Sequence, residues 1–299
     1  MAKNYRLKGH GSFAIREGWI TKALLAIQEY EKQNPDKNFF SKENFNGADS
    51  LGVGSNMALS IKFWLRVSGL IEQKNTHLTE LAHIILQYDP YLENDMTLYF
   101  LHINIASNRQ EATIWNLFFQ TMSNLEFDRQ KLEERMKETF ESVFQTDYPI
   151  HSLENDCSVL LQMYVRQNTE DIDPEDNRLC PFQRLHLISR HGKNYIRETQ
   201  FDISGYAVLY AMKKQLQLKE PLRGHKVQSI SIDELLQGCN SPGRLLNLTR
   251  ISLNDALDEL QNKGYLHVDR TAGLDMVYIA KNLPDKAEQI VKMYYEIGE

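Results

Sequence analysis

The sequence has no apolar run long enough to cross a membrane, and it contains few cysteines. No stretch of its 299 residues approaches the ~20 apolar residues that a membrane-spanning helix needs. The first residues, Met1 to Lys8, lack the apolar segment of a secretory signal. The cysteines Cys157, Cys180 and Cys239 are odd in number, far apart and form no C-x-x-C pair, which argues against a disulfide framework and a zinc module. We therefore expect a cytoplasmic protein without membrane contact.

The usual motifs of nucleotide binding and metal catalysis are also missing. The glycines at positions 9 and 11 are not part of a Gly-x-x-x-x-Gly-Lys-Ser/Thr loop, and Leu51-Gly-Val-Gly54 lacks the third glycine of a dinucleotide fingerprint. No His-Glu-x-x-His occurs, and the nine histidines are scattered. Cys180 precedes Pro181 and has no identifiable base beside it, which favours a buried structural thiol over a reactive one. The sequence thus predicts no active site, no metal and no cofactor.

Negative charge exceeds positive charge overall, but positive charge is concentrated near the N-terminus. The chain carries a net charge of −6, which is unfavourable for phosphate binding unless its cations gather locally. Residues 1–22 contain one acidic residue, Glu17, against five basic ones: Lys3, Arg6, Lys8, Arg16 and Lys22. This segment is therefore the first candidate for an anion-binding surface.

Two helical stretches end in a glycine that is followed at once by apolar residues. The first runs from Met57 to Gly69 and the second from Thr249 to Gly264. In each, apolar residues lie four and eight positions before the glycine, which predicts one buried stripe. Glycine suits the left-handed turn that ends a helix because it has no Cβ to clash.

A helix, a glycine, a short strand, a turn and a second strand form the second half of a winged helix-turn-helix. The candidate wings are Gln73–Thr76 and Thr271–Gly273. We therefore expect a mainly α protein with small β wings, in which winged helix-turn-helix units at both ends flank a helical middle domain. The expected domains are residues 1–90, 91–222 and 223–299.

Several motifs spread over nearly the whole chain indicate a family. They are Lys8-Gly-His-x-Ser-Phe-x-x-Arg-Glu-Gly-Trp19, Leu51-Gly-Val-Gly-x-Asn-Met57, Ile61-Lys-x-Trp64, Asp89-Pro-Tyr-Leu-Glu93, Ala112-Thr-x-Trp115 and Cys180-Pro-Phe182. Together they resemble a bacterial domain-of-unknown-function family whose members are often encoded beside DNA phosphorothioation genes. These genes specify a cysteine desulfurase, a sulfurtransferase and an ATPase. The resemblance implies a part in DNA sulfur modification or the linked phage defence, and it supplies no catalytic residue.

The candidate DNA-binding residues come from three places. In the N-terminal motif, Lys8, His10, Ser12 and Arg16 offer hydrogen-bond donors to phosphate oxygens, and the glycines allow close approach of the backbone. The alternative is that Phe13 and Trp19 pack in the core while Arg16 and Glu17 form local pairs.

The two glycine-terminated helices supply the remaining candidates. They are Lys62 and Arg66 on the first helix, and Arg244, Arg250 and Asn254 on or before the second. The acidic residues Asp255, Asp258 and Glu259 on the second helix oppose phosphate binding there. DNA contact is therefore expected more strongly from the first helix than from the second.

The leading hypothesis is a non-enzymatic, double-stranded-DNA-binding accessory subunit of a phosphorothioation or phage-defence system. The first alternative is a protein-interaction scaffold that bridges the sulfurtransferase and the ATPase without touching DNA, because winged helices also bind proteins. The weakest alternative is a thiol-relay enzyme that acts through Cys180.

Overall fold

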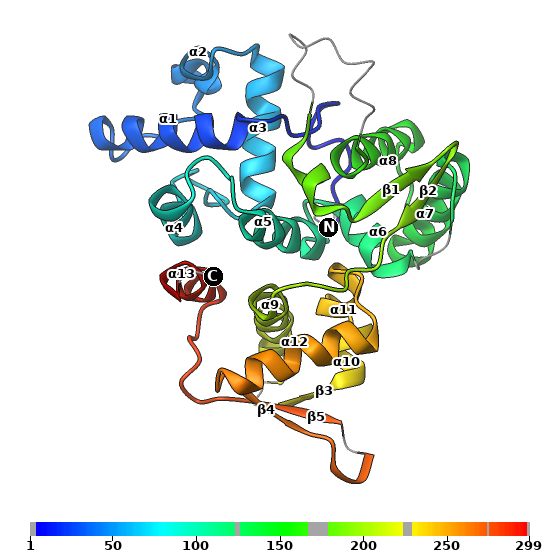
Figure 1. Ribbon diagram of the computed structural model, residues 1–299. Coiled ribbons are helices and arrows are strands. Elements are labelled where there is room, and N and C mark those ends of the chain that lie inside the picture. The colour runs from blue at the N-terminus through cyan, green and yellow to red at the C-terminus, as the bar shows by residue number, and fades with distance from the viewer. Residues whose placement is uncertain (1–3, 123–125, 167–178, 224–228, 274, 298–299) are drawn as a thin grey trace. The chain divides into compact units, whose positions relative to one another are not determined.

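The computed structural model describes residues 4–122, 126–166, 179–223, 229–273 and 275–297 (Figure 1). The chain divides into two compact units, Met1–Arg197 and Glu198–Glu299. Both are mainly α-helical, and each contains one small antiparallel sheet. Among the described residues, no helix has both the length and the apolar character needed to span a membrane.

The N-terminal unit consists of eight described α-helices, two short 3-10 helices and one hairpin. The helices are α1 (Trp19–Gln33), α2 (Ala48–Leu51), α3 (Ser55–Val67), α4 (Glu80–Tyr88), α5 (Asp95–Ser107), α6 (Thr113–Thr121), α7 (Arg129–Phe144) and α8 (Ile150–Tyr164). The 3-10 helices are η1 (Lys42–Gly47) and η3 (Pro181–Leu185), and the hairpin pairs β1 (Ile188–His191) with β2 (Asn194–Arg197).

Helix α3 follows its sequence pattern closely. Its apolar stripe, Ile61 and Leu65, is buried, and Trp64 beside it is only 1% exposed. The helix ends at Val67, and Gly69 follows with φ +78, the left-handed conformation predicted for the terminating glycine. One face of α3 is thus fixed in the core, which leaves the other face available for function.

The centre of this unit is a cluster of aromatic side chains. Helix α5 is buried on nearly all sides, and its buried residues include the polar Thr97, His102 and Asn104 beside the apolar ones. Trp115, Phe118 and Phe119 of α6 are each at most 1% exposed, and Phe119 packs edge-on against Tyr164 of α8 at a centroid distance of 5.4 Å. This aromatic cluster packs against the buried face of α3, where the ring centroids of Trp115 and Trp64 are 5.2 Å apart.

The C-terminal unit consists of five described α-helices, one short 3-10 helix and a three-stranded sheet. Its elements are α9 (Gly205–Arg223), β3 (Ser229–Ser231), α10 (Ile232–Gln237), α11 (Pro242–Leu245), α12 (Arg250–Asn262), β4 (Leu266–Asp269), η4 (Thr271–Gly273), β5 (Met276–Ile279) and α13 (Ala287–Ile297). The strand order is β3-β5-β4, and both pairings are antiparallel. Helix α9 packs against α12 and α13.

Local sequence patterns account for where helix α10 begins and helix α12 ends. Ser231 stands three residues before Glu234, which is the spacing of a capping box, and it caps α10 by accepting a hydrogen bond from the Glu234 backbone amide at 3.2 Å. Helix α12 ends just before Gly264, which has φ +76. The segments predicted as strands around Thr271–Gly273 are β4 and β5.

The observed structure differs from expectation in two places. After α3, the predicted strand pair is reduced to a single β-bridge between Ile71 and Leu78. Helix α9, which we expected in the middle segment, runs to Arg223 and packs within the C-terminal unit. The mainly α fold with small antiparallel sheets is confirmed, and the three-domain division stays a prediction. The polar composition of residues 168–177 predicts a loop, and this stretch lies outside the described residues.

Candidate nucleic-acid interface

The N-terminal glycine motif forms a loop that lies directly on helix α3. Two tight turns shape it, since the Gly11 amide donates to the Lys8 carbonyl and the Phe13 amide to the His10 carbonyl, both at 3.1 Å. The hydroxyl of Ser60 donates to the His10 carbonyl at 2.5 Å, and Trp64 Nε1 donates to the Phe13 carbonyl at 2.9 Å. The loop is therefore fastened to α3 at two points.

Close packing explains the first glycine of the motif. A Cβ at Gly9 would lie 2.4 Å from Phe63 Cε2 and 2.7 Å from Arg6 Nε, distances that real Cβ atoms do not show. Gly11 adopts φ +68, where a side chain is disfavoured. The glycines thus serve the approach of the loop to α3.

His10 lies in the interior beneath the loop. It is fully buried, and its Nε2 atom is 2.8 Å from Asp156 Oδ1 of helix α8. The same carboxylate accepts a 2.9 Å hydrogen bond from the Lys8 backbone amide, and the imidazole stacks on Trp64 at a centroid distance of 5.5 Å. Desolvation raises the pKa of Asp156, and the hydrogen bond from His10 opposes that rise. His10 therefore holds the loop in place from below.

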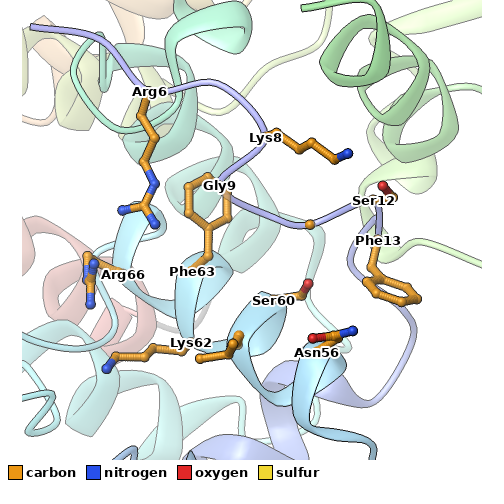
Figure 2. A pocket seen from close by; sticks show the side chains of 12 residues that line it. Arg6, Lys8, Gly9, Ser12, Phe13, Asn56, Ser60, Lys62, Phe63 and Arg66 are labelled. Carbon is orange, nitrogen blue, oxygen red and sulfur yellow. The ribbon is translucent and has the colours of Figure 1, made fainter. Parts of the chain in front are cut away.

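The loop and the exposed face of α3 enclose a hollow of about 620 Å³ (Figure 2). Its lining combines basic, polar and glycine residues with two aromatic rings: Arg6, Lys8, Gly9, Gly11, Ser12, Phe13, Asn56, Leu59, Ser60, Lys62, Phe63 and Arg66. Four of these residues carry positive charge and none carries negative charge. A region lined in this way favours an anion.

The cations of the hollow have few carboxylate partners. Arg6 forms an ion pair with Glu111 at 2.7 Å. Desolvation lowers the pKa of Lys62, and the nearby charges of Arg66 and Arg6 lower it further. Desolvation also lowers the pKa of Arg66, against the raising effect of Glu111. The hollow thus holds cations that folding leaves partly desolvated and mutually repelling.

The structure brings together four of the six candidates from the N-terminal motif and the first helix. Lys8, Ser12, Lys62 and Arg66 line the hollow, whereas His10 does not. Arg16 lies outside it, with its guanidinium 5.4 Å from the Trp19 ring centroid and 6.0 Å from that of Phe13, which agrees with local packing. Sequence reasoning counted Arg6 in the basic segment but did not select it.

The candidates of the C-terminal unit are engaged with acidic and backbone groups. Arg250 forms ion pairs with Asp233 and with Asp275, the latter at 3.2 Å. Arg244 Nε donates to the Gln237 carbonyl at 2.6 Å. Asn254 Oδ1 accepts a 3.4 Å hydrogen bond from Arg270, which also pairs with Asp258 at 2.8 Å. This arrangement leaves less positive charge for a phosphate than the hollow does.

Cys180 is 2% exposed at the start of η3, and burial raises the pKa of its thiol. Cys157 is equally buried, whereas Cys239 is exposed. A thiol held protonated in the interior is a poor nucleophile. Among the described residues, no group of three or more histidine, cysteine, aspartate or glutamate side chains is placed to hold a metal ion.

Replacing Cys180 by serine is expected to lower the unfolding free energy by ~1–2 kcal/mol, because a hydroxyl is costlier to bury than a thiol. Any contribution of the protein to DNA sulfur modification should be retained. Thermal unfolding and the sulfur content of cellular DNA check the two parts. A fully stable Cys180→Ser protein that abolishes sulfur incorporation would establish the thiol-relay alternative.

Fold and site together define a mainly α-helical protein with a basic hollow on its N-terminal unit. The family described as "Protein of unknown function (DUF4007)" matches residues 7–295, and the chain belongs to this family.

Two solved structures are similar in fold. A magnesium ion-bound crystal structure of SspB is 21% identical with a TM-score of 0.79, covering 97% of this chain and 88% of that one. A second SspB crystal structure is also 21% identical with a TM-score of 0.78, covering 99% and 90%. No curated protein matches the chain.

Proposed function

We propose that this protein is a non-enzymatic DNA-binding subunit of a bacterial DNA phosphorothioation or phage-defence system. The observation that carries the proposal is the hollow beside α3, where Arg6, Lys8, Lys62 and Arg66 gather in a chain whose net charge is −6. Local concentration of positive charge is what phosphate binding requires of an acidic protein. The link to DNA sulfur modification comes from the family resemblance of the motifs.

The surroundings of the hollow also suit a nucleic-acid backbone. Ser12 and Asn56 are exposed polar side chains beside the cations and can donate to phosphate oxygens. The exposed face of α3 is opposite a buried stripe, as in a helix that is presented to a DNA groove. We propose that α3 is the recognition helix of an N-terminal winged-helix unit.

The C-terminal unit has the element order of a winged helix: strand β3, helices α10 to α12, then strands β4 and β5. We propose that the C-terminal unit is also a winged helix, but that it binds a protein and not DNA. Arg250 and Arg270 are paired with carboxylates, and Ile251 on α12 is 73% exposed. These two observations favour a protein partner for this unit, such as the sulfurtransferase or the ATPase of the system. The scaffold alternative is thereby retained for one half of the chain.

Duplex DNA is expected to bind in the micromolar range at ~50 mM salt and to dissociate steeply as salt rises, because the contact is mainly electrostatic. Fluorescence anisotropy with a labelled duplex, repeated over a series of salt concentrations, measures both quantities. Absence of binding at the lowest salt would contradict the DNA-binding function and favour the scaffold alternative.

A further inference from the structure

The cations of the hollow fall into two groups on either side of Phe63. In Figure 2, the charged ends of Arg6, Lys62 and Arg66 lie on one side of the ring, whereas Lys8 extends away on the other side toward Ser12. Mutual electrostatic effects among Arg6, Lys62 and Arg66 agree with this grouping. We call these three residues the cation cluster.

The cation cluster is not neutralised by the protein. Among the described residues, the carboxylate of Glu111 pairs with Arg6 and also acts on Arg66. Three positive charges against this one negative charge give the cation cluster a net charge of +2. Within the part of the chain that the structure describes, no ion pair joins Lys62 or Arg66 to a carboxylate. The Nε atom of Arg66 is buried and has no hydrogen-bond partner in the described structure. A buried donor without a partner is unfavourable, so the protein leaves the Arg66 guanidinium incompletely hydrogen-bonded as well as unpaired with a carboxylate.

We propose that the cation cluster is a discrete binding site for one terminal phosphate monoester, the group found at the end of a nucleic-acid strand or on a nucleotide. A terminal phosphate carries up to two negative charges near neutral pH, since its second pKa is about 6, and it offers three terminal oxygens. An internal phosphodiester carries one charge and offers two such oxygens. The dianion matches both the net charge of +2 and the three separate donor groups.

This inference rests on the proposed function in assigning the hollow to nucleic acid, but it is tested separately. The probes are two unlabelled single-stranded tetranucleotides of one sequence, one with a 5′-phosphate and one with a 5′-hydroxyl, together with inorganic phosphate as a competitor. Isothermal titration at about 50 mM salt gives the affinity of each. We expect the phosphorylated strand to bind at least about tenfold tighter and inorganic phosphate to compete with it.

Amino-acid substitutions test whether the cation cluster causes the preference for the phosphorylated strand. Arg66→Gln should remove the preference for the phosphorylated strand. The matched control Lys37→Ala/Lys131→Ala removes two exposed lysines of the same unit that neither line the hollow nor lie in the candidate wing, and it should retain the preference. Thermal unfolding of each variant verifies that it is folded.

Equal affinity for the two strands, no binding of either, or an undiminished preference in folded Arg66→Gln would each overturn the inference. Duplex DNA with 5′-hydroxyl ends distinguishes this failure from that of the proposed function. If that duplex binds and the phosphorylated strand shows no preference, only the terminal-phosphate site is wrong. If inorganic phosphate and the phosphorylated strand bind but the duplex does not, the cation cluster stands and the DNA-binding function fails.

Discussion

Replacing Trp64 by alanine is expected to unfold the N-terminal unit at lower temperature, with a loss of ~3–5 kcal/mol in unfolding free energy. The indole is 1% exposed and contacts Trp115 and the His10 imidazole. Its removal would leave a large cavity and also delete the donor to the Phe13 carbonyl. For a unit of this size, a loss of that magnitude corresponds to roughly 10 °C in the midpoint of thermal unfolding.

Leu59→Ala is the matched control for this prediction. Leu59 lies on the same helix but is 46% exposed, so its truncation should change stability by no more than ~0.5 kcal/mol. Calorimetry of both variants measures their melting temperatures and shows whether the loss of stability comes from the buried Trp64 side chain or from any truncation on α3. An unchanged melting temperature for Trp64→Ala would mean that α3 is not held by its buried face.

The double replacement Lys62→Ala/Arg66→Ala is expected to act in the opposite way, on DNA binding and not on folding. Both side chains are half-buried cations whose charged forms are disfavoured by desolvation, so their loss should leave stability nearly unchanged. Each charge-assisted contact to a phosphate is worth at least about 1.5 kcal/mol, or roughly tenfold in affinity. The double variant should therefore bind duplex DNA about 100-fold more weakly.

The salt dependence gives a second, independent measure. Loss of two phosphate contacts should flatten the slope of log affinity against log salt by up to about two units. Lys37→Ala/Lys131→Ala again serves as the control for net charge, because both lysines are exposed in the same unit and lie outside the hollow and the candidate wing. If the Lys62/Arg66 variant binds DNA like the parent protein, α3 is not a recognition helix.

Much of the secondary structure could be predicted because its signals are local. Gly69 and Gly264 end their helices in the left-handed conformation, and Ser231 caps α10, as their sequence positions indicated. The stripe of Ile61 and Leu65 specified which face of α3 is buried. The extent of the candidate wing after α3 was not predictable, since Ile71 and Leu78 form one bridge and no third strand extends it among the described residues.

The candidate site also has features that the sequence predicts and features that only the tertiary structure decides. Composition alone located the basic N-terminal segment, and helical spacing alone paired Lys62 with Arg66, because both properties depend on neighbours in the sequence. Tertiary structure decided which cations are available. It joined Arg6 to the α3 cations and to Glu111, 105 residues away, and it buried His10 against Asp156, 146 residues away. It also paired Arg250 with Asp233 and Asp275 across separate elements. The charge and burial of a side chain depend on partners that only the folded chain brings together, and no local pattern encodes them.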